Sequence, residues 1–330
     1  MRWPVRGKSG MMGQGANRAP WAGQGLRLGA RSLWMVLVAV ALIVLAACGR
    51  DRAPAQEATL EPTVAVATAT PVPTPTPTPI PAIPPQPPIS LAAGRIPAYG
   101  YEIVATLPHD AGAYTQGLQY VDGLFYESTG RNGMSSLRRV EPETGRVQQR
   151  HDLAAELFGE GLAVVGERIY QLTWQSNVAF VYDKGTFAEI ERFSYPGEGW
   201  GLTWDGSRLL MSDGSDAVVA RDPRDFSETG RIQVTYQGQP LLRLNELEYI
   251  NGEIWANVYQ SDWVVRIDPV TGAVTSVVDL AGLLANVEVT GPVDVLNGIA
   301  WDEAGQRLFV TGKWWPAVFQ IRLKQIGWMQ

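Results

Sequence analysis

The chain has 330 residues, of which 45% are hydrophobic and 18% charged, and it carries 12 Trp, 35 Gly, 23 Pro and a formal net charge of −6. This composition is typical of a folded protein rich in turns, and the negative charge argues against a nucleic-acid-binding surface. The single cysteine, Cys48, excludes an intrachain disulfide and a cysteine-based zinc site, and two histidines are too few for a histidine-rich metal centre. We therefore expect no metal and no other cofactor.

The chain begins with a basic segment and continues into an apolar one. Residues 1–34 hold five Arg, one Lys and no acid, and an apolar run covers residues 33–47. This run is short for a transmembrane helix and has the length of the apolar region of a signal peptide. It ends in Leu-Ala-Ala directly before Cys48, which resembles a bacterial lipobox. We expect residues 1–47 to be a lipoprotein signal peptide that is cleaved before a lipidated Cys48; an uncleaved signal anchor is the alternative.

Either form of the leader places the rest of the chain outside the cytoplasm. Cleavage removes six positive charges and changes the net charge from −6 to −12. Residues 48–98 are rich in Pro, Thr and Ala, a composition that cannot bury apolar surface and is typical of an extended spacer. We expect a bacterial lipoprotein, anchored to the cell membrane through Cys48, with a disordered tether over residues 48–98 and a folded domain over residues 99–330.

A short pattern recurs five times in the folded domain: a polar or aromatic residue, then Gly or Glu, then Leu or Ile. Successive copies are 44, 40, 45 and 52 residues apart. The copies begin at Gln116, Glu160, Trp200, Asn245 and Asn297. Each copy is followed by a turn, a second apolar strand and further strands. Four short strands per repeat, five times over, predict an all-β fold, a five-bladed β-propeller with four-stranded antiparallel blades.

The fifth repeat ends near Leu323 after only three strands. The segment Tyr101–Leu107 precedes the first repeat and has the pattern of a strand. We therefore expect this N-terminal strand to supply the missing fourth strand and to close the ring, which leaves no exposed sheet edge.

In an antiparallel blade, the start of the first strand lies on the same side as the end of the second. The residues that begin the five repeats should therefore surround the central channel together with the residues that follow the second strands. Those residues are Thr129, Trp174, Gly214, Tyr259 and Lys313. The two rings combine one carboxylate, one lysine, three amides and three large aromatic side chains, which is the usual composition of a small-molecule site.

Six short motifs of these repeats occur in order between about Thr106 and Ile321. They are Tyr114-Thr115-Gln116-Gly117-Leu118, Tyr126-Glu127-Ser128-Thr129-Gly130, Phe158-Gly159-Glu160-Gly161-Leu162, Gly199-Trp200-Gly201-Leu202, Asn245-Glu246-Leu247-Glu248-Tyr249 and Thr311-Gly312-Lys313-Trp314. Together they resemble the plant and bacterial glutamine cyclotransferase family. The resemblance implies a five-bladed propeller that converts the N-terminal glutamine of peptides to pyroglutamate, with release of ammonia and without a catalytic zinc.

The resemblance, together with the ring position of Asn297, indicates which residues form the site. Three are expected to be catalytic: Glu160, Lys313 and Asn245. Seven are expected to bind the substrate: Gln116, Tyr114, Phe158, Trp174, Trp200, Tyr259 and Asn297. Tyr114 stands where the family usually has Phe, and Tyr259 where it usually has Trp, so both positions keep an aromatic wall and bear on substrate preference.

In this reaction the α-amine attacks the γ-carboxamide. Glu160 would take a proton from the amine and pass one to the leaving ammonia. Lys313 would stabilise the developing oxyanion or hold Glu160 ionised. The structural alternatives are a turn acid for Glu160, a surface lysine for Lys313, strand-end capping for Asn245 and Gln116, and core packing for the tryptophans. Four further charged residues are expected to have structural parts only: His109, Asp110, Glu127 and Glu248.

Two other classes of function remain open. A non-catalytic propeller that binds a ligand or a protein would share the fold, because a fold alone does not establish catalysis. A metal-dependent lactonase or a lyase would need several carboxylates or histidines around the channel, whereas the two rings contain one carboxylate and no histidine. We therefore predict a glutaminyl-peptide cyclotransferase, an acyltransferase that acts as a monomer on peptides or proteins with N-terminal glutamine.

Overall fold

The computed structural model describes residues 95–329, and the predictions for the signal peptide, for Cys48 and for residues 48–94 lie outside them. Within the described residues almost all regular structure is β-strand, and the helical structure is one 3-10 turn, η1 (Leu283–Asn286). The all-β class is therefore confirmed. No helix in this part of the chain is long and apolar enough to cross a membrane.

Three four-stranded antiparallel sheets follow one another along the chain. The first contains β2 (Thr115–Val121), β3 (Leu124–Thr129), β4 (Ser136–Val140) and β5 (Val147–Asp152). The second contains β6 (Gly159–Val165), β7 (Arg168–Thr173), β8 (Val178–Asp183) and β9 (Glu189–Ser194). The third contains β10 (Leu202–Trp204), β11 (Leu209–Ser212), β12 (Ala217–Arg221) and β13 (Glu228–Gln233). In each sheet, strands that are consecutive in the sequence are neighbours in space.

The remaining strands form one eight-stranded sheet and a small hairpin of β14 (Thr235–Tyr236) and β15 (Gln239–Pro240). The order in the large sheet is β16 (Leu244–Ile250), β17 (Glu253–Val258), β18 (Trp263–Ile267), β19 (Val274–Asp279), β1 (Ile96–Pro108), β22 (Ala317–Met329), β21 (Arg307–Gly312) and β20 (Leu296–Asp302). β1 is parallel to β19 and antiparallel to β22, so the sheet is mixed.

The prediction of a five-bladed propeller with five four-stranded antiparallel blades, closed by an N-terminal strand, is wrong. The eight-stranded sheet overturns it, because β1 pairs along both edges and joins what the repeats indicated to be separate sheets. An extended strand presents backbone N–H and C=O groups on both edges, and either edge can pair. The sequence repeats predict the strands of each repeat, but they do not show whether the strands of one repeat pair with those of the next.

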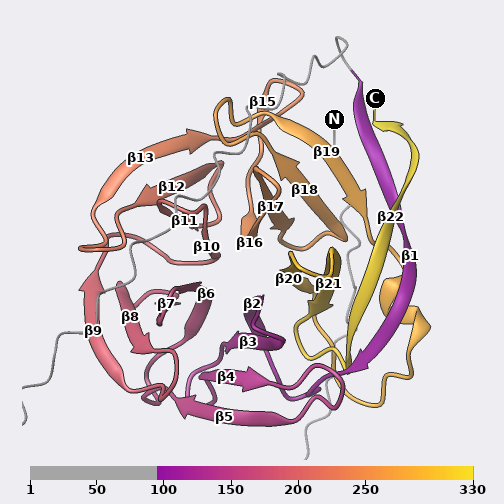
Figure 1. The fold of residues 1–330 in the computed structure, drawn as a ribbon. Helices are drawn as coiled ribbons and strands as arrows, with labels where there is room; N and C mark the ends of the chain where they lie inside the picture. Colours follow the sequence, from indigo (N-terminus) through magenta and orange to yellow (C-terminus); the bar gives the residue numbers. More distant parts are fainter. Residues whose placement is uncertain (1–94, 330) are drawn as a thin grey trace, which may run out of the picture. The chain divides into compact units, whose positions relative to one another are not determined.

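The described sheets surround a common centre (Figure 1). The innermost strands are β2, β6, β10, β16 and β20 (Figure 1), and each contacts the next around the centre, with β20 contacting β2. β5, β9, β13 and β19 lie at the outer edge (Figure 1). This arrangement brings the starts of the five inner strands together, although they are far apart in the sequence.

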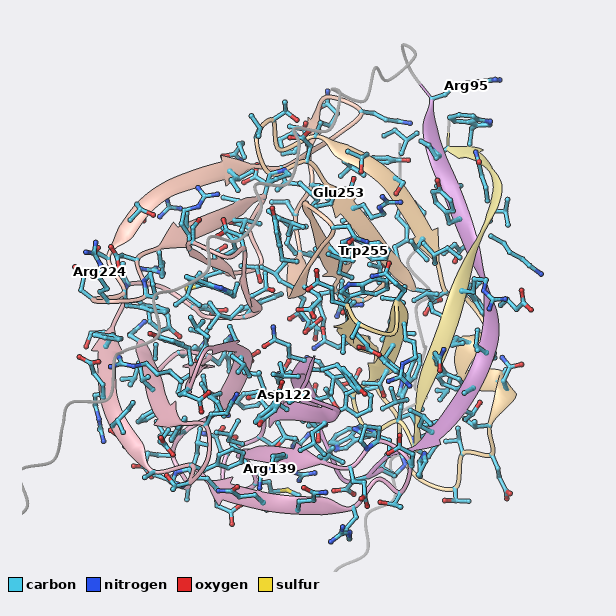
Figure 2. The ribbon with its side chains drawn as sticks, viewed as in Figure 1. Arg95, Asp122, Arg139, Arg224, Glu253 and Trp255 are labelled. Carbon is cyan, nitrogen blue, oxygen red and sulfur yellow. The ribbon has the colours of Figure 1, made fainter. Side chains whose placement is uncertain are left out.

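Side chains fill the space between neighbouring sheets (Figure 2). Between the second and third sheets, Tyr170 and Leu172 of β7 belong to one buried cluster with Leu209 and Met211 of β11. Full burial of such an apolar side chain contributes about 1.5–3 kcal/mol. The Tyr170 hydroxyl donates to the carbonyl of Pro223 at 2.7 Å, so its polar end is also satisfied. This packing holds the inner strands in fixed positions.

Four of the five inner strands begin with an irregularity in their pairing. The register slips between Thr115 and Gly117, Gly159 and Leu162, Leu244 and Leu247, and Leu296 and Ile299. The four slips contain the predicted residues Gln116, Glu160, Asn245 and Asn297. An irregularity of this kind redirects a side chain out of the regular alternation, and such features concentrate next to active sites. In β2, β6, β16 and β20 the register shift therefore lies at the predicted site residue.

Candidate active site

Gln116 and Glu160 form the buried polar centre of the candidate site. They lie at the starts of the neighbouring inner strands β2 and β6, and both are almost fully buried. The Gln116 side-chain amide donates to Glu160 Oε1 at 3.0 Å. Burial raises the pKa of Glu160 well above its usual range, the positive charge of Lys313 opposes this rise, and the negative charge of Glu198 adds to it. A carboxyl group whose pKa is raised in this way is a better proton acceptor than an ordinary carboxylate.

Lys313 follows β21 and is almost fully buried beside two aromatic rings. Its Nζ lies 4.8 Å from the ring centre of Tyr114 and 5.3 Å from that of Tyr259. Burial lowers the pKa of Lys313, whereas the negative charges of Glu160 and Asp294 raise it. The aromatic faces favour the ammonium form. The structure therefore does not support the alternative of an ordinary surface lysine.

The predicted aromatic residues form two groups. Tyr114 meets Phe158 edge-on with the ring centres 6.2 Å apart, and Phe158 meets Trp174 in the same way at 5.6 Å. Trp200 and Tyr259 form a second edge-on pair at 5.5 Å. Rings at these distances attract each other beyond the area that they bury. Four of these side chains are partly exposed and Trp174 is 36% exposed, so the aromatic wall opens to solvent.

The two predicted asparagines are both buried, and within residues 95–329 the side-chain oxygen of each has no hydrogen-bond donor. The Asn297 side-chain amide donates to the backbone carbonyl of Thr115 at 3.0 Å and lies 3.5 Å from Gln116 Oε1, so it holds the start of β2. A buried acceptor without a donor is rare in folded proteins. It makes Asn245 a candidate acceptor for a substrate N–H group.

Glu198 is a site residue that the sequence did not indicate. Its Oε2 accepts a hydrogen bond from the indole nitrogen of Trp174 at 2.7 Å and from that of Trp200 at 2.9 Å. One carboxylate therefore orients two of the predicted aromatic walls. Glu198 lies in the loop between β9 and β10, in the sequence Gly-Glu-Gly directly before Trp200. The same triplet surrounds Glu160, and this similarity is a signal that could have identified Glu198.

Asp294 is a second unpredicted residue next to the site. Its Oδ2 accepts a hydrogen bond from the Tyr114 hydroxyl at 2.9 Å. Its backbone amide donates to the carbonyl of Lys313 at 3.0 Å, and the amide of Lys313 donates to Val295 at the same distance. Asp294 therefore fixes one aromatic wall and places a negative charge near Lys313. No strand pattern covers this segment, so the sequence provided no indication of its position.

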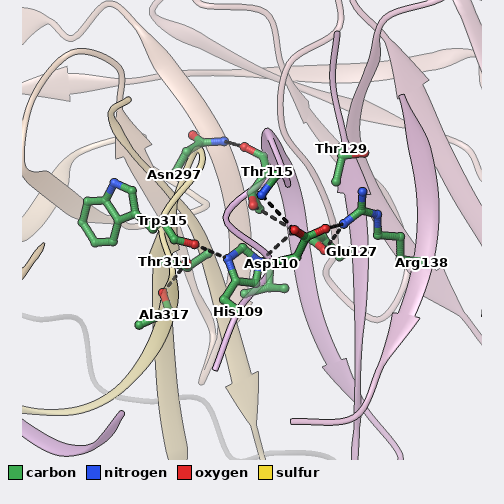
Figure 3. A network of polar contacts seen from close by, with 12 residues as sticks. His109, Asp110, Thr115, Glu127, Thr129, Arg138, Asn297, Thr311, Trp315 and Ala317 are labelled. Carbon is green, nitrogen blue, oxygen red and sulfur yellow. Dashed lines mark hydrogen bonds and ion pairs between the residues drawn. The ribbon is translucent and has the colours of Figure 1, made fainter. Parts of the chain in front are cut away.

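A buried polar network supports the start of β2 from below (Figure 3). Glu127 Oε1 lies 3.0 Å from His109 Nε2 and accepts a hydrogen bond from the Thr115 hydroxyl at 2.8 Å. Arg138 lies 2.8 Å from Asp110 and 3.8 Å from Glu127. Burial alone would raise the pKa of Glu127, but the charges of His109 and Arg138 outweigh burial and lower it. The network fixes Thr115, the residue that precedes Gln116.

Metal ligands do not gather at any point in the described part of the chain. Within residues 95–329, no three His, Cys, Asp or Glu side chains lie close enough together to hold a metal ion. The carboxylates near the site are instead bonded to protein donors: Glu160 to Gln116, Glu198 to two indoles and Asp294 to Tyr114.

Comparison with known proteins identifies the family. A sequence profile described as glutamine cyclotransferase matches residues 82–323. The chain belongs to the glutamine cyclotransferase family. The resemblance expected from the six motifs is therefore confirmed.

Two relatives of this family illustrate the similarity. "Glutaminyl-peptide cyclotransferase" of Arabidopsis thaliana is 45% identical to this chain over 228 residues, which cover 68% of this chain and 71% of the relative. The crystal structure of Myxococcus xanthus glutaminyl cyclase is similar to the described fold, with a TM-score of 0.66 and 39% sequence identity. That match covers 70% of this chain and 99% of the Myxococcus chain.

Proposed function

We propose that the folded domain is a glutaminyl-peptide cyclotransferase, an acyltransferase that converts the N-terminal glutamine of peptides or proteins to pyroglutamate and releases ammonia. The observation that carries the proposal is the buried carboxyl group of Glu160, bonded to Gln116 and influenced by the charge of Lys313. Family membership supports the same activity. The relatives named above carry this activity in their names.

Glu160 is the proposed proton shuttle. The neutral α-amine of the substrate attacks the carbon of its own γ-carboxamide, a C–N bond forms, and Glu160 accepts the proton that the amine loses. Glu160 then donates a proton to the amide nitrogen, the C–N bond to that nitrogen breaks, and ammonia leaves. The proton count balances within one carboxyl group, and a shuttle of this kind contributes about 10²–10⁴-fold to a rate.

Lys313 and Asn245 are the proposed partners of the reacting carboxamide. The carbonyl oxygen becomes negative during attack, and the buried ammonium of Lys313 stabilises this charge more strongly than it would in water. Asn245 Oδ1 accepts a hydrogen bond from the amide N–H, which satisfies an acceptor that has no donor within residues 95–329. Both groups interact most strongly with the tetrahedral intermediate, which is the condition for catalysis.

The aromatic residues are proposed to hold the glutaminyl side chain in a folded conformation. The two reacting groups belong to one residue, so the main barrier that positioning can lower is the entropy of bringing them together. Ideal intramolecular cases gain about 7–11 kcal/mol in this way. Trp174 and Trp200 are oriented by Glu198, so their faces are fixed before the substrate binds.

Ammonia release from a peptide that begins with glutamine tests the proposal. The purified full-length chain is assayed with and without a chelator, beside Glu160→Gln and the control Glu167→Gln, which changes an exposed acid in the turn between β6 and β7. We expect chelator-resistant activity that falls about 10²–10⁴-fold in Glu160→Gln and is unchanged in the control. Loss of activity with the chelator would contradict the metal-free mechanism.

A folded protein that cyclises none of a panel of such peptides would instead favour a non-catalytic binding function. Near-ultraviolet circular dichroism checks the fold in each case. The lipid anchor at Cys48, the position outside the cytoplasm and the monomeric state remain predictions from the sequence, and we propose them together with the activity.

A further inference from the structure

An exposed arginine lies on the rim of the site next to Tyr114. Arg131 is in the loop between β3 and β4, directly after Gly130, whose amide donates to the backbone carbonyl of Tyr114 at 2.8 Å. The Arg131 guanidinium carbon lies 5.6 Å from the ring centre of Tyr114 and 4.9 Å from that of Trp314. Two aromatic faces therefore hold a positive charge in place beside the wall of the site.

The Arg131 guanidinium has no acidic partner among the residues that the structure describes. Within residues 95–329 it forms neither an ion pair nor a hydrogen bond, so its donors are available to a ligand. Arg131 has a φ of 88° and Trp314 has a φ of 61°. A residue other than glycine adopts this left-handed backbone at a cost on the order of 1–3 kcal/mol, and such residues cluster at ligand-binding places. Both strained residues face each other at this rim.

Trp314 also lines a cavity of about 300 Å³. Its remaining wall consists of Ala111, Gly112, Pro316 and the segment 289–293. The ring centres of Trp314 and Tyr114 are also 4.7 Å apart. Trp314 therefore contacts Tyr114 of the site, packs against the Arg131 guanidinium and lines the cavity. The cavity therefore adjoins the aromatic wall through Trp314.

The rim carries charges of both signs. Beside Tyr114 lie both the Arg131 guanidinium and Asp294, whose carboxylate already accepts a hydrogen bond from the Tyr114 hydroxyl. Glu198 lies beside the two tryptophans of the wall. A peptide that begins with glutamine has an amine at its N-terminus and carboxylate groups only in its later part. Complementary charge favours the orientation in which the amine lies toward Glu198 and the later part of the peptide lies over Tyr114 toward Arg131.

We propose that Arg131, Trp314 and the adjoining cavity form the subsite for the residue that follows the N-terminal glutamine. Arg131 binds a carboxylate of that residue, which is the terminal carboxylate of a dipeptide or the side chain of Asp or Glu. The cavity accommodates an apolar side chain at the same position. This inference rests on the proposed cyclotransferase function and adds a class of preferred substrates to it.

Paired substrates test the carboxylate contact. Gln-Gly with a free carboxylate and Gln-Gly amide are compared with the full-length protein, with Arg131→Gln and with Arg224→Gln, which changes an arginine in the outer turn between β12 and β13 (Figure 2). We expect Arg131→Gln to raise KM about three- to tenfold for the free acid, a range that corresponds to the net contribution of one typical hydrogen bond. In Arg131→Gln, KM for the amide and kcat for both substrates should be unchanged. In the control Arg224→Gln, KM and kcat for both substrates should equal those of the wild type.

The possible outcomes separate the inference from the function on which it rests. If Arg131→Gln changes KM by the same factor for the free acid and for the amide, the proposed carboxylate contact is overturned. Such a result would indicate that Arg131 only packs beside Trp314. If no peptide is cyclised, the proposed function fails, and calorimetric binding of the same two peptides still decides the subsite. Equal affinity for acid and amide in wild type would overturn it.

Filling the cavity tests the second part of the subsite. A Cβ at Gly291 would have no atom within 4 Å, so Gly291→Phe introduces a ring into the cavity wall without a collision at its first atom. We expect a higher KM for Gln-Leu than in wild type and an unchanged KM for free glutamine amide. An unchanged KM for Gln-Leu would overturn the assignment of the cavity.

Discussion

The ionisation of Glu160 depends on charged groups that act in opposite directions. Burial is the main cause of its raised pKa, Lys313 lowers this pKa, and Glu198 raises it. A base must be deprotonated to act, so kcat/KM should rise with pH through the pKa of Glu160 in the free enzyme. Removing the charge of Lys313 and removing that of Glu198 should therefore shift the pH dependence of kcat/KM in opposite directions.

Removal of the positive charge of Lys313 should move the acidic limb of the kcat/KM–pH profile to higher pH. Lys313→Met deletes the ammonium that favours the ionised form of Glu160, so the pKa of Glu160 should rise further. We also expect kcat to fall by about 10²–10³-fold, since a charge that stabilises the oxyanion is lost. The measurement is kcat/KM from pH 5 to pH 9, with Lys313→Arg as the control that keeps the charge. A limb that moves to lower pH would disprove the proposed coupling.

Removal of the negative charge should move the same limb to lower pH. Glu198→Gln deletes the charge that raises the pKa of Glu160. It also turns one of the two carboxylate oxygens, which together accept from Trp174, Trp200 and Gln175, into an NH2 donor. We expect a larger change in KM than in kcat, because the walls lose orientation while Glu160 and Lys313 remain. Steady-state kinetics over the same pH range measures both effects. An unchanged pH dependence of kcat/KM would indicate that Glu198 acts only as a hydrogen-bond acceptor for the two indoles.

At the scale of the strands, the site depends on the close approach of the five inner strands. A Cβ at Gly161 would lie 2.5 Å from the backbone nitrogen of Leu202 and 2.6 Å from the carbonyl of Trp200. The fourth repeat differs, because Glu246 stands where the other repeats have glycine. Its carboxylate accepts hydrogen bonds from the amides of Leu118 at 3.2 Å and Ile299 at 2.8 Å and so joins three inner strands.

Gly161→Ala should therefore disturb both stability and activity. The methyl group meets backbone atoms, which cannot move without shifting β10, and such overpacking costs about 1–3 kcal/mol. We expect a lower midpoint in denaturant unfolding and a weaker activity, because Glu160 precedes Gly161. Gly230→Ala is the matched control, since a Cβ at Gly230 has no atom within 4 Å. Equal stability of the two variants would contradict the close-approach argument.

The predicted strand positions explain why much of the candidate site could be anticipated. A side chain at the start of a strand is determined by local pattern, so the repeats alone indicated Gln116, Glu160, Asn245 and Asn297. Glu198, Asp294 and Arg131 lie in loops, where no periodic pattern marks which side chain faces the site. Their places depend on contacts with residues far away in the sequence.

At the scale of the whole folded domain, the site is assembled from all the large sheets. Gln116 belongs to the first sheet, Glu160 to the second, and Asn245 to the eight-stranded sheet, while Trp200 precedes the third. No single sheet carries a complete set of catalytic groups. Activity should therefore be lost in the same transition as the fold.

The complete chain carries one further prediction, the lipid anchor. In a bacterial host fed an alkyne-labelled fatty acid, we expect the label on the wild-type chain and none on Cys48→Ser, because the chain has no other cysteine. Intact mass should show that residues 1–47 are absent from the wild type and retained in the variant. A wild-type chain without label, or with the leader retained, would favour the uncleaved signal anchor.

The sequence by itself determined the all-β class, the approximate places of the strands and the residues that begin them, because these depend on local composition and on the period of the apolar pattern. Only the tertiary structure decided that β1 joins β19 to β22 in one mixed sheet. The backbone groups that form such a pairing are the same in every residue, so no side-chain pattern specifies which edges will meet. The charge of Glu198, unlike that of Lys313, was likewise placed near Glu160 only when segments far apart in the sequence came together in space.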